Sequence, residues 1–256
     1  MSQNIYDRPD FFAAYSETID RSGHKDLDKD LLWKRLRTLL PPSLAGLRVL
    51  DVGCGSGWFA RWAVTHGGAA SVTALDISTN MITKARALNR DLDPALAAKI
   101  DYRIADLDGS AHDLGEGYDL AFSSLVLHYI AALRPLVEAV HGALRPGALF
   151  VVNLEHPVYT APRRPRVVED AEGERSWNLG AYHEEGERVV DWLAPGLRKQ
   201  HRTLQGYLDI FMGAGFELAR LVELLPTEEE LAAGEFDEEE LLRPLFLMMG
   251  LKKRLE

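Results

Sequence analysis

The sequence predicts an α/β protein built on a mostly parallel sheet with helices on both faces. Short apolar runs alternate with helical patterns from about residue 47 to 155. Several of these runs are apolar on consecutive positions, which is typical of strands buried on both faces. Three glycines spaced two apart separate the first run from the helical pattern that follows it. This alternation favours parallel strands joined by helical crossovers.

Composition limits the possible functions. The 256 residues are 46% hydrophobic, which suits one large domain or one domain with an insertion. The net charge is -10, and we find no basic stripe of the kind that nucleic-acid binding needs. The single cysteine excludes an intramolecular disulfide. The start does not resemble a signal peptide and no run is long enough for a membrane helix, so we expect a cytoplasmic protein.

The N-terminal part, residues 1–44, is expected to form a helical lid. Leucines recur at helical spacing within residues 11–40, and Pro41 and Pro42 end that pattern. The core is assigned to residues 45–155. Its strands are expected at 47–53, 71–78, 99–107, 118–127 and 148–155, with helices at 57–68, 78–92 and 133–144.

Residues 156–200 break this rhythm. The segment is rich in Pro, Arg, Glu, Trp and Tyr and is too long for an ordinary connection, so we expect a substrate-binding insertion or cap. The core pattern then resumes in residues 201–256. A helix is expected at 201–215, strands at 216–226 and 243–253, and a solvated acidic helix face at 228–240.

The glycine-rich turn predicts a nucleotide-type ligand, because glycines let backbone N–H groups approach it closely. The spacing Gly53-x-Gly55-x-Gly57 differs from the dinucleotide fingerprint G-x-G-x-x-G. Asp51, just before the first glycine, disfavours a pyrophosphate and favours a cationic group. Asp76 ends the second strand, where a carboxylate can accept both ribose hydroxyls. The pattern therefore predicts a nucleoside with a cationic appendage and no phosphates.

Five segments then resemble, in order and spacing, the motifs of class I S-adenosylmethionine-dependent methyltransferases. They are VLDVGCGSG (49–57), ALDIS (74–78), ADL (105–107), YDLAFSSLVLHYI (118–130) and LRPGALFVV (144–152). The sequence is most similar to the bacterial small-molecule "type 11" group. The resemblance implies a seven-stranded Rossmann-like sheet with the last strand antiparallel, S-adenosyl-L-methionine as cofactor and S-adenosyl-L-homocysteine as product.

The resemblance also implies roles for matching residues. The methionine part of the cofactor would lie against Asp51, Gly53, Cys54, Gly55, Gly57 and Ser123. The ribose would bind Asp76, and the adenine would contact Ile77, Met81, Asp106 and Leu107. The N-terminal lid would close the site with Tyr6 and Tyr15 over the sulfonium and Arg21 near the ligand carboxylate.

Methyl transfer is an in-line displacement, so catalysis depends mainly on positioning, and a base is needed only if the acceptor must lose a proton. His128 lies at the carboxyl end of the fourth strand and is the first candidate for a base or a positioning group; a purely supporting role is the alternative. His156 and Tyr15 are further candidates. The acceptor is expected to contact Tyr159, Trp177, Tyr182, Trp192 and His201, because the aromatic side chains could form a wall for a flat molecule.

The expected function is methyl transfer to a small aromatic metabolite at an O, N or C atom, with a place in secondary metabolism suggested by the aromatic insertion. Phe122-Ser123-Ser124-Leu125 replaces the Pro-Pro clamp typical of enzymes that methylate planar exocyclic amines. The alternatives are a nicotinamide-dependent oxidoreductase, a catalytically inert S-adenosylmethionine-binding protein, and a methyltransferase acting on protein or RNA. We expect a monomer or homodimer with no metal, nucleic-acid or membrane partner.

Overall fold

The structure, a computed structural model, describes residues 3–20, 27, 30–109, 113–234, 236 and 238–255. The helical pattern predicted over residues 11–40 corresponds to two separate helices, α1 (Pro9–Thr18) and α2 (Leu31–Arg37). A short 3-10 turn, η1 (Ile5–Asp7), precedes α1. Asp30 caps α2, since its carboxylate accepts a hydrogen bond from Trp33 N–H.

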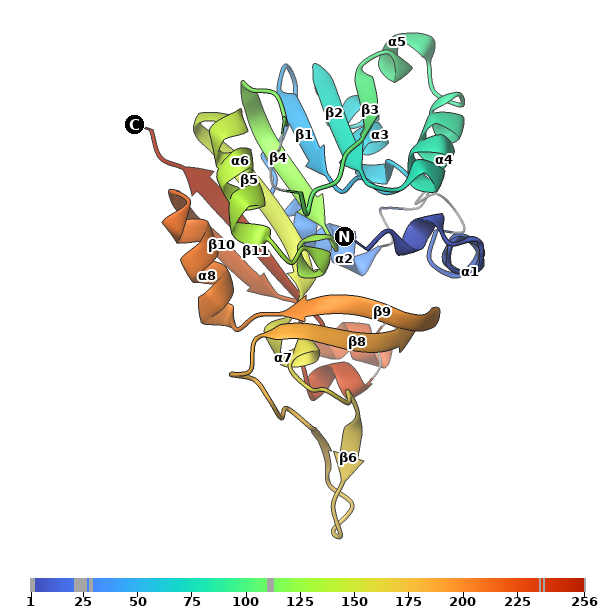
Figure 1. The fold of residues 1–256 in the computed structure, drawn as a ribbon, viewed down its shortest axis with the longest axis vertical. Helices are drawn as coiled ribbons and strands as arrows, with labels where there is room; N and C mark the ends of the chain where they lie inside the picture. Colours follow the sequence, from blue (N-terminus) through green and yellow to red (C-terminus); the bar gives the residue numbers. More distant parts are fainter. Residues whose placement is uncertain are drawn as a thin grey trace.

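A seven-stranded sheet forms the centre of the molecule, with the order β10-β11-β5-β4-β1-β2-β3 (Figure 1). Its strands are β1 (Arg48–Val52), β2 (Ser71–Asp76), β3 (Ile100–Ile104), β4 (Tyr118–Ser124), β5 (Leu144–Glu155), β10 (Phe216–Glu223) and β11 (Phe246–Lys253). The last strand, β11, is antiparallel to both of its neighbours, and the other pairs are parallel. The predicted fold class is confirmed.

Helices cover both faces of this sheet. One face packs against α2, α3 (Trp58–Thr65) and α4 (Thr79–Asn89), and the other packs against α6 (Leu133–Ala143) and α8 (Leu204–Gly213). Phe59 of α3 stacks on Phe122 of β4 with ring centroids 3.6 Å apart. The short α5 (Pro94–Ala97) precedes β3, and η3 (Leu127–Tyr129) follows β4. Among the described residues, every helix is too short or too polar to span a bilayer.

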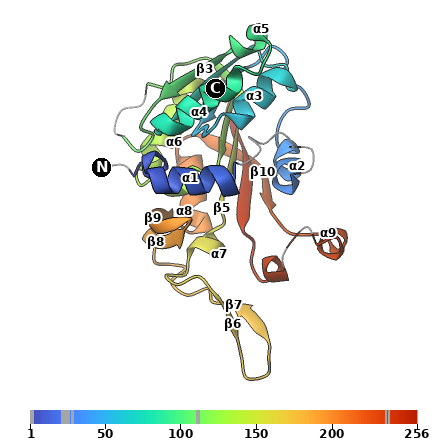
Figure 2. The ribbon, with the colours of Figure 1, turned by 90° about the vertical axis from the view of Figure 1, so that its right-hand side faces the viewer.

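The segment between β5 and α8 contains two hairpins that the sequence pattern did not reveal. It begins with α7 (Pro157–Thr160) and continues with the pair β6 (Val167–Glu169) and β7 (Arg175–Trp177). The second pair is β8 (Gly186–Trp192) and β9 (Ala194–His201). Figures 1 and 2 show β6–β7 projecting from the body, whereas β8–β9 lies beside α1 at the end of the sheet.

The acidic run after β10 contains α9 (Glu228–Ala232) and the 3-10 turn η4 (Glu238–Leu241). Neither element contains a buried residue, although Glu230 forms an ion pair of 2.7 Å with Arg35 of α2. The run therefore lies at the surface, with one of its carboxylates attached to the body.

The N-terminal segment, residues 3–18, is fixed to the body at two places. Aromatic rings join it to the β8–β9 hairpin, because Phe11 and Tyr15 both contact Trp192 edge-on, at 5.9 and 6.3 Å. Asp7 joins it to the start of α4. The Asp7 carboxylate accepts hydrogen bonds from Ser78 Oγ at 2.6 Å and from Asn80 N–H at 3.0 Å. The segment is thereby held across the carboxyl ends of the strands.

We predict that Asp7→Ala loosens this segment. Amide exchange in α1 should rise roughly tenfold, since a hydrogen bond to a charged group contributes about 1.5 kcal/mol or more. Burial opposes ionisation of Asp7, but hydrogen bonds from Asn80, Ser78 and Asn4 outweigh it and lower the pKa. The contribution is therefore complete above the ordinary Asp pKa and is lost as the pH falls through the lowered value.

Hydrogen–deuterium exchange followed by mass spectrometry measures this effect. Asp10→Ala is the control, because Asp10 is an exposed carboxylate of the same segment whose side chain pairs with Arg8. Equal exchange rates in α1 of the two variants would show that Asp7 does not hold the segment.

Candidate active site

A cavity of about 450 Å³ opens at the carboxyl ends of β1, β2, β4 and β5. The N-terminal segment, α2, the glycine-rich turn after β1, the β4–η3 connection and Trp192 of β8 all contribute to its wall. This is the edge of an open α/β sheet where ligands bind, because the strand order reverses there between β1 and β4. The described residues contain no group of three or more His, Cys, Asp or Glu side chains arranged as a metal site.

The turn after β1 is shaped by three glycines with positive φ angles: 79° at Gly53, 54° at Gly55 and 77° at Gly57. A side chain at Gly53 would collide with Val126, and one at Gly57 would collide with the ring of Tyr102. At Gly55, by contrast, no atom lies within 4 Å of the place that a Cβ would take. Gly53 and Gly55 line the cavity, whereas Gly57 is a packing glycine at the start of α3.

Two buried carboxylates flank this turn. Asp76, at the end of β2, lines the cavity and accepts hydrogen bonds from Gly55 N–H at 2.8 Å and Ser78 N–H at 2.9 Å. Burial raises the pKa of Asp76, although these two hydrogen bonds act to lower it. Asp51 is 2% exposed, and burial and the charge of Asp76 raise its pKa. The Oδ2 atom of Asp51 accepts no hydrogen bond from the described residues. Asp51 does not line the cavity, so of these two acids only Asp76 borders a ligand bound there.

The other residues assigned to the cofactor divide into two groups. The cavity wall includes Tyr6, Tyr15, Cys54, Ile77, Met81, Asp106 and Leu107. Ser123 does not reach the wall, because it is fully buried and its hydroxyl donates to Val52 O at 2.9 Å, joining β4 to β1. Arg21 lies outside the described residues. Burial raises the pKa of the Cys54 thiol, so this side chain is an unreactive part of the wall.

His128 lies in η3, is 1% exposed and lines the cavity. Its Nδ1 atom accepts a hydrogen bond of 3.4 Å from Glu155 N–H. Burial lowers the pKa of His128 to about 4, although the charge of Glu155 opposes the shift. The ring is therefore neutral at neutral pH and carries its proton on Nε2 while Nδ1 accepts this bond. In this form it donates a hydrogen bond more readily than it removes a proton.

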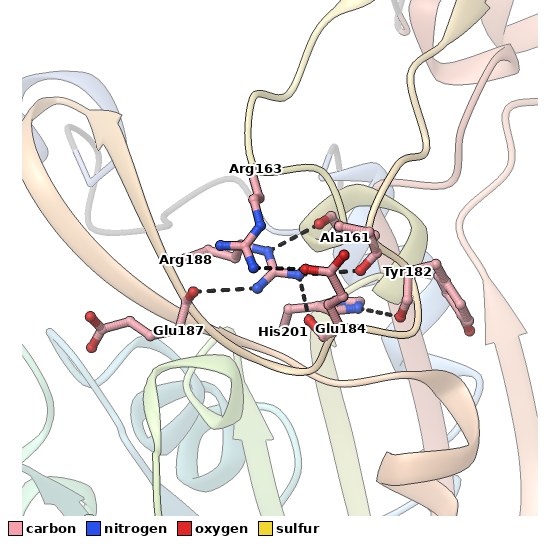
Figure 3. A network of polar contacts seen from close by, with 8 residues as sticks. Ala161, Arg163, Tyr182, Glu184, Glu187, Arg188 and His201 are labelled. Carbon is pink, nitrogen blue, oxygen red and sulfur yellow. Dashed lines mark hydrogen bonds and ion pairs between the residues drawn. The ribbon is translucent and has the colours of Figure 1, made fainter.

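The two histidines that bound the long insertion are held in structural contacts. His156 caps α7 by accepting from Val158 N–H at 3.0 Å, and its Nε2 lies 2.9 Å from Glu223. His201 is fully buried and bonds to Thr160 Oγ1 and to Tyr182 O, each at 2.8 Å (Figure 3). Neither ring lines the cavity.

Of the four aromatic residues expected to form the acceptor wall, Tyr159 and Trp192 line the cavity, whereas Trp177 and Tyr182 do not. Trp177 stacks on the outer side of Tyr159 at 5.9 Å, with its indole N–H donating to Val158 O. The Tyr182 hydroxyl accepts from Leu204 N–H. Trp177 thus supports the wall through Tyr159, whereas Tyr182 packs at the base of the insertion beside His201.

A polar network holds the base of the insertion beside His201 (Figure 3). The Arg188 side chain donates to the backbone oxygens of Ala161 at 3.0 Å and Glu184 at 2.6 Å. Arg163 adds an exposed ion pair with Glu184 at 2.8 Å. The network ties the β8–β9 hairpin to the residues just after α7.

The sequence did not single out Tyr129, Trp58 or Glu155, although all three line the cavity. Glu155 is the last residue of β5, and its carboxylate lies 2.5 Å from Lys199 Nζ on β9. Its position at the carboxyl end of a core strand was the available signal. Its partner, 44 positions along the chain, could not be read from the pattern.

Comparison with known proteins gives a consistent result. The methyltransferase-domain family model matches residues 50–150. The crystal structure of an S-adenosylmethionine-dependent methyltransferase from Mesorhizobium loti is 43% identical, with a TM-score of 0.80, covering 89% of this chain and all of that one. A Listeria monocytogenes protein assigned to the same class is 30% identical over 87% of this chain and 96% of that one, with a TM-score of 0.75.

The tRNA U34 carboxymethyltransferase of Methylococcus capsulatus is 30% identical over 207 residues. This match covers 80% of the present chain but 56% of that enzyme's length.

Gly55→Ala and Gly57→Ala should have different consequences, because only the first position faces the cavity. Gly57→Ala should lower the free energy of unfolding by about 2 kcal/mol or more, from backbone strain and the collision with Tyr102. Gly55→Ala should cost about 1 kcal/mol of backbone strain and mainly weaken ligand binding. Urea unfolding and calorimetric titration with S-adenosylhomocysteine separate the two effects. Equal losses of stability would contradict this assignment.

His128 should make stability depend on pH. Because its pKa is lower in the folded than in the unfolded chain, protonation favours unfolding once the pH falls below about 6.5. Between neutral pH and pH about 5, the free energy of unfolding of the wild type should fall by about 2 kcal/mol more than that of His128→Asn. Urea unfolding at neutral pH and at pH about 5 measures this difference. The control is His66→Asn, at an exposed site, which should behave as wild type; an identical pH dependence in all three proteins would refute the burial argument.

Proposed function

Because the chain belongs to the S-adenosylmethionine-dependent methyltransferases, we propose that it transfers the methyl group to a small molecule held in the cavity at the ends of β4 and β5. S-adenosylmethionine is the cofactor and S-adenosylhomocysteine the product. The observation that carries the proposal is the composition of the cavity. One part offers a glycine-rich turn and Asp76, and the other offers aromatic and apolar side chains.

The residues present fit this cofactor. Asp76 would accept the ribose hydroxyls, with Ile77 and Met81 against the adenine. Asp106 and Leu107 would contact the adenine edge. The open space at Gly55 would admit the methionine part, whose positive charges suit the buried Asp51. When bound, the cofactor supplies an electrophilic methyl group on a sulfonium.

The acceptor would lie against Tyr129, Tyr159 and Trp192, with Ile130 and Phe246 completing an apolar wall. The N-terminal segment would act as the lid over this space, and with the β8–β9 hairpin it would limit access of water. Such exclusion removes the hydration shell of the acceptor, and fixed walls align it with the methyl group. Flat aromatic molecules suit these walls best.

His128 would position the acceptor by donating from Nε2, rather than act as a general base, because its proton remains on that atom. Tyr15 would close the lid. Burial and the nearby Tyr6 and Asp20 raise the pKa of Tyr15, so its hydroxyl stays protonated at neutral pH. His156 would support α7 and not act on the substrate. Transfer to an acceptor that need not lose a proton then depends mainly on alignment.

The cavity argues for a small-molecule acceptor over RNA or protein. Five acidic and no Lys or Arg side chains belong to the described part of its wall, which would repel a phosphate backbone. Action on tRNA belongs to a relative that extends well beyond the region of similarity. A nicotinamide reaction would require a pyrophosphate beside Asp51.

We predict that Asp76→Ala weakens binding of S-adenosylhomocysteine by about tenfold to a hundredfold, because two buried hydroxyls lose a charged acceptor. Isothermal titration calorimetry measures the affinity. Asp101→Ala is the matched control, since Asp101 is exposed on β3 and pairs with Arg103. Unchanged affinity in the Asp76 variant would place the ribose elsewhere.

A further inference from the structure

Glu155 lies at the acceptor end of the cavity. It ends β5, and two strands, β4 and β1, separate β5 from β2, where Asp76 would hold the ribose. With neighbouring strands about 4.8 Å apart, the two carboxylates belong to strands about 14 Å apart across the sheet. His128, Tyr129 and Tyr159 share this end of the wall. Glu155 is therefore placed to meet the acceptor and not the adenosine.

One oxygen of Glu155 is occupied and the other is free. Oε1 lies 2.5 Å from Nζ of Lys199, which is 6% exposed and whose ammonium lies 5.8 Å from the ring centroid of Trp192. Oε2 is buried and accepts no hydrogen bond from the described residues. Leaving a buried acceptor unsatisfied costs about 1–3 kcal/mol, and more when it is charged. Glu155 itself lines the cavity, so a ligand bound there could supply the missing partner.

The charges around the cavity indicate what this partner is. Its described wall contains five carboxylates and neither lysine nor arginine: Asp30, Asp76, Asp106, Asp108 and Glu155. Lys199 is not part of the wall and already pairs with Glu155. An anionic group beside Glu155 would face a like charge, with no lysine or arginine among the described lining residues to balance it. A hydroxyl or amine would instead donate a hydrogen bond to the free oxygen of Glu155.

We infer that Glu155 selects the acceptor: its free Oε2 receives a hydrogen bond from an O–H or N–H group of an uncharged or cationic acceptor, and anionic acceptors are rejected. Lys199 holds Oε1, which leaves Oε2 as the carboxylate oxygen available to the acceptor. Glu155 is thus a specificity-determining residue of the acceptor site. The inference rests on the proposed function, since it concerns the second substrate of the same reaction.

Four small aromatic probes test the inference on the full chain saturated with S-adenosylhomocysteine. Phenol carries an O–H donor and aniline an N–H donor, anisole has neither, and benzoate is an anion. Ligand-observed NMR titrations should give about tenfold tighter binding of phenol or aniline than of anisole and benzoate, the discrimination expected from one buried polar contact.

Glu155→Gln should reverse this order. The amide oxygen is retained by the Lys199 ammonium, so the amide NH₂ faces the cavity as a donor where Oε2 was an acceptor. Benzoate and anisole should then bind more tightly than phenol and aniline. Glu187→Gln is the control, because Glu187 is exposed on β8 and pairs only distantly with Arg198, at 3.7 Å. It should retain the wild-type order.

Each outcome decides the inference. Three results with the wild type would overturn it, even if the Glu155 variant does not fold. These are equal binding of phenol, aniline and anisole, preferred binding of benzoate, and binding of none of the probes. A folded variant that keeps the wild-type order also overturns it. Calorimetry with S-adenosylhomocysteine separates this failure from that of the proposed function, because loss of cofactor binding in the wild type would refute the function itself.

Discussion

The hydrogen bonds between the glycine-rich turn and the end of β2 are the constraint on which the site depends. Gly53 N–H and Cys54 N–H both donate to Leu75 O at 2.8 Å, and Gly55 N–H donates to Asp76. These bonds fix the end of β1 to the end of β2, and they hold the Asp76 carboxylate at the cavity wall. The turn can make these hydrogen bonds because three of its residues have positive φ angles, which only glycine adopts at little cost.

The second half of the site is built by segments far apart in the sequence. The N-terminal segment reaches the cavity through Asp7 at α4 and through aromatic contacts with Trp192 of β8. The same hairpin carries Lys199, which binds Glu155 at the end of β5. The hairpin therefore contacts both the N-terminal segment and the end of β5.

The sequence predicted the sheet well, because each core strand is a short apolar run bounded by polar residues and a helical pattern. The residues assigned to the cofactor came from local motifs, in each of which they lie within a few positions of each other along the chain, and most of them line the cavity. Gly57 shows the limit of motif reasoning. A glycine is needed there because a side chain would collide with Tyr102, a residue of β3 that no local pattern connects to the turn. Its packing role was visible only in three dimensions.

The insertion was harder to predict. The strands β6 and β7 are short and lack buried residues, so they do not show the apolar alternation that identifies a strand. Aromatic content suggested an acceptor wall, but content does not reveal which side of a hairpin faces the cavity. Tyr159 and Trp192 line it, whereas Trp177 and Tyr182 do not. Glu155 could not be distinguished in the same way, because its ion pair with Lys199 joins two strands that are far apart in the sequence.

A crystal structure of the protein with S-adenosylhomocysteine bound tests the central claim most directly. We expect the ribose hydroxyls within hydrogen-bond distance of the Asp76 carboxylate, with the thioether sulfur directed toward the end of β5, where Glu155 lies. Adenosine found at the Glu155 end of the cavity, or a ligand bound outside it, would contradict the account.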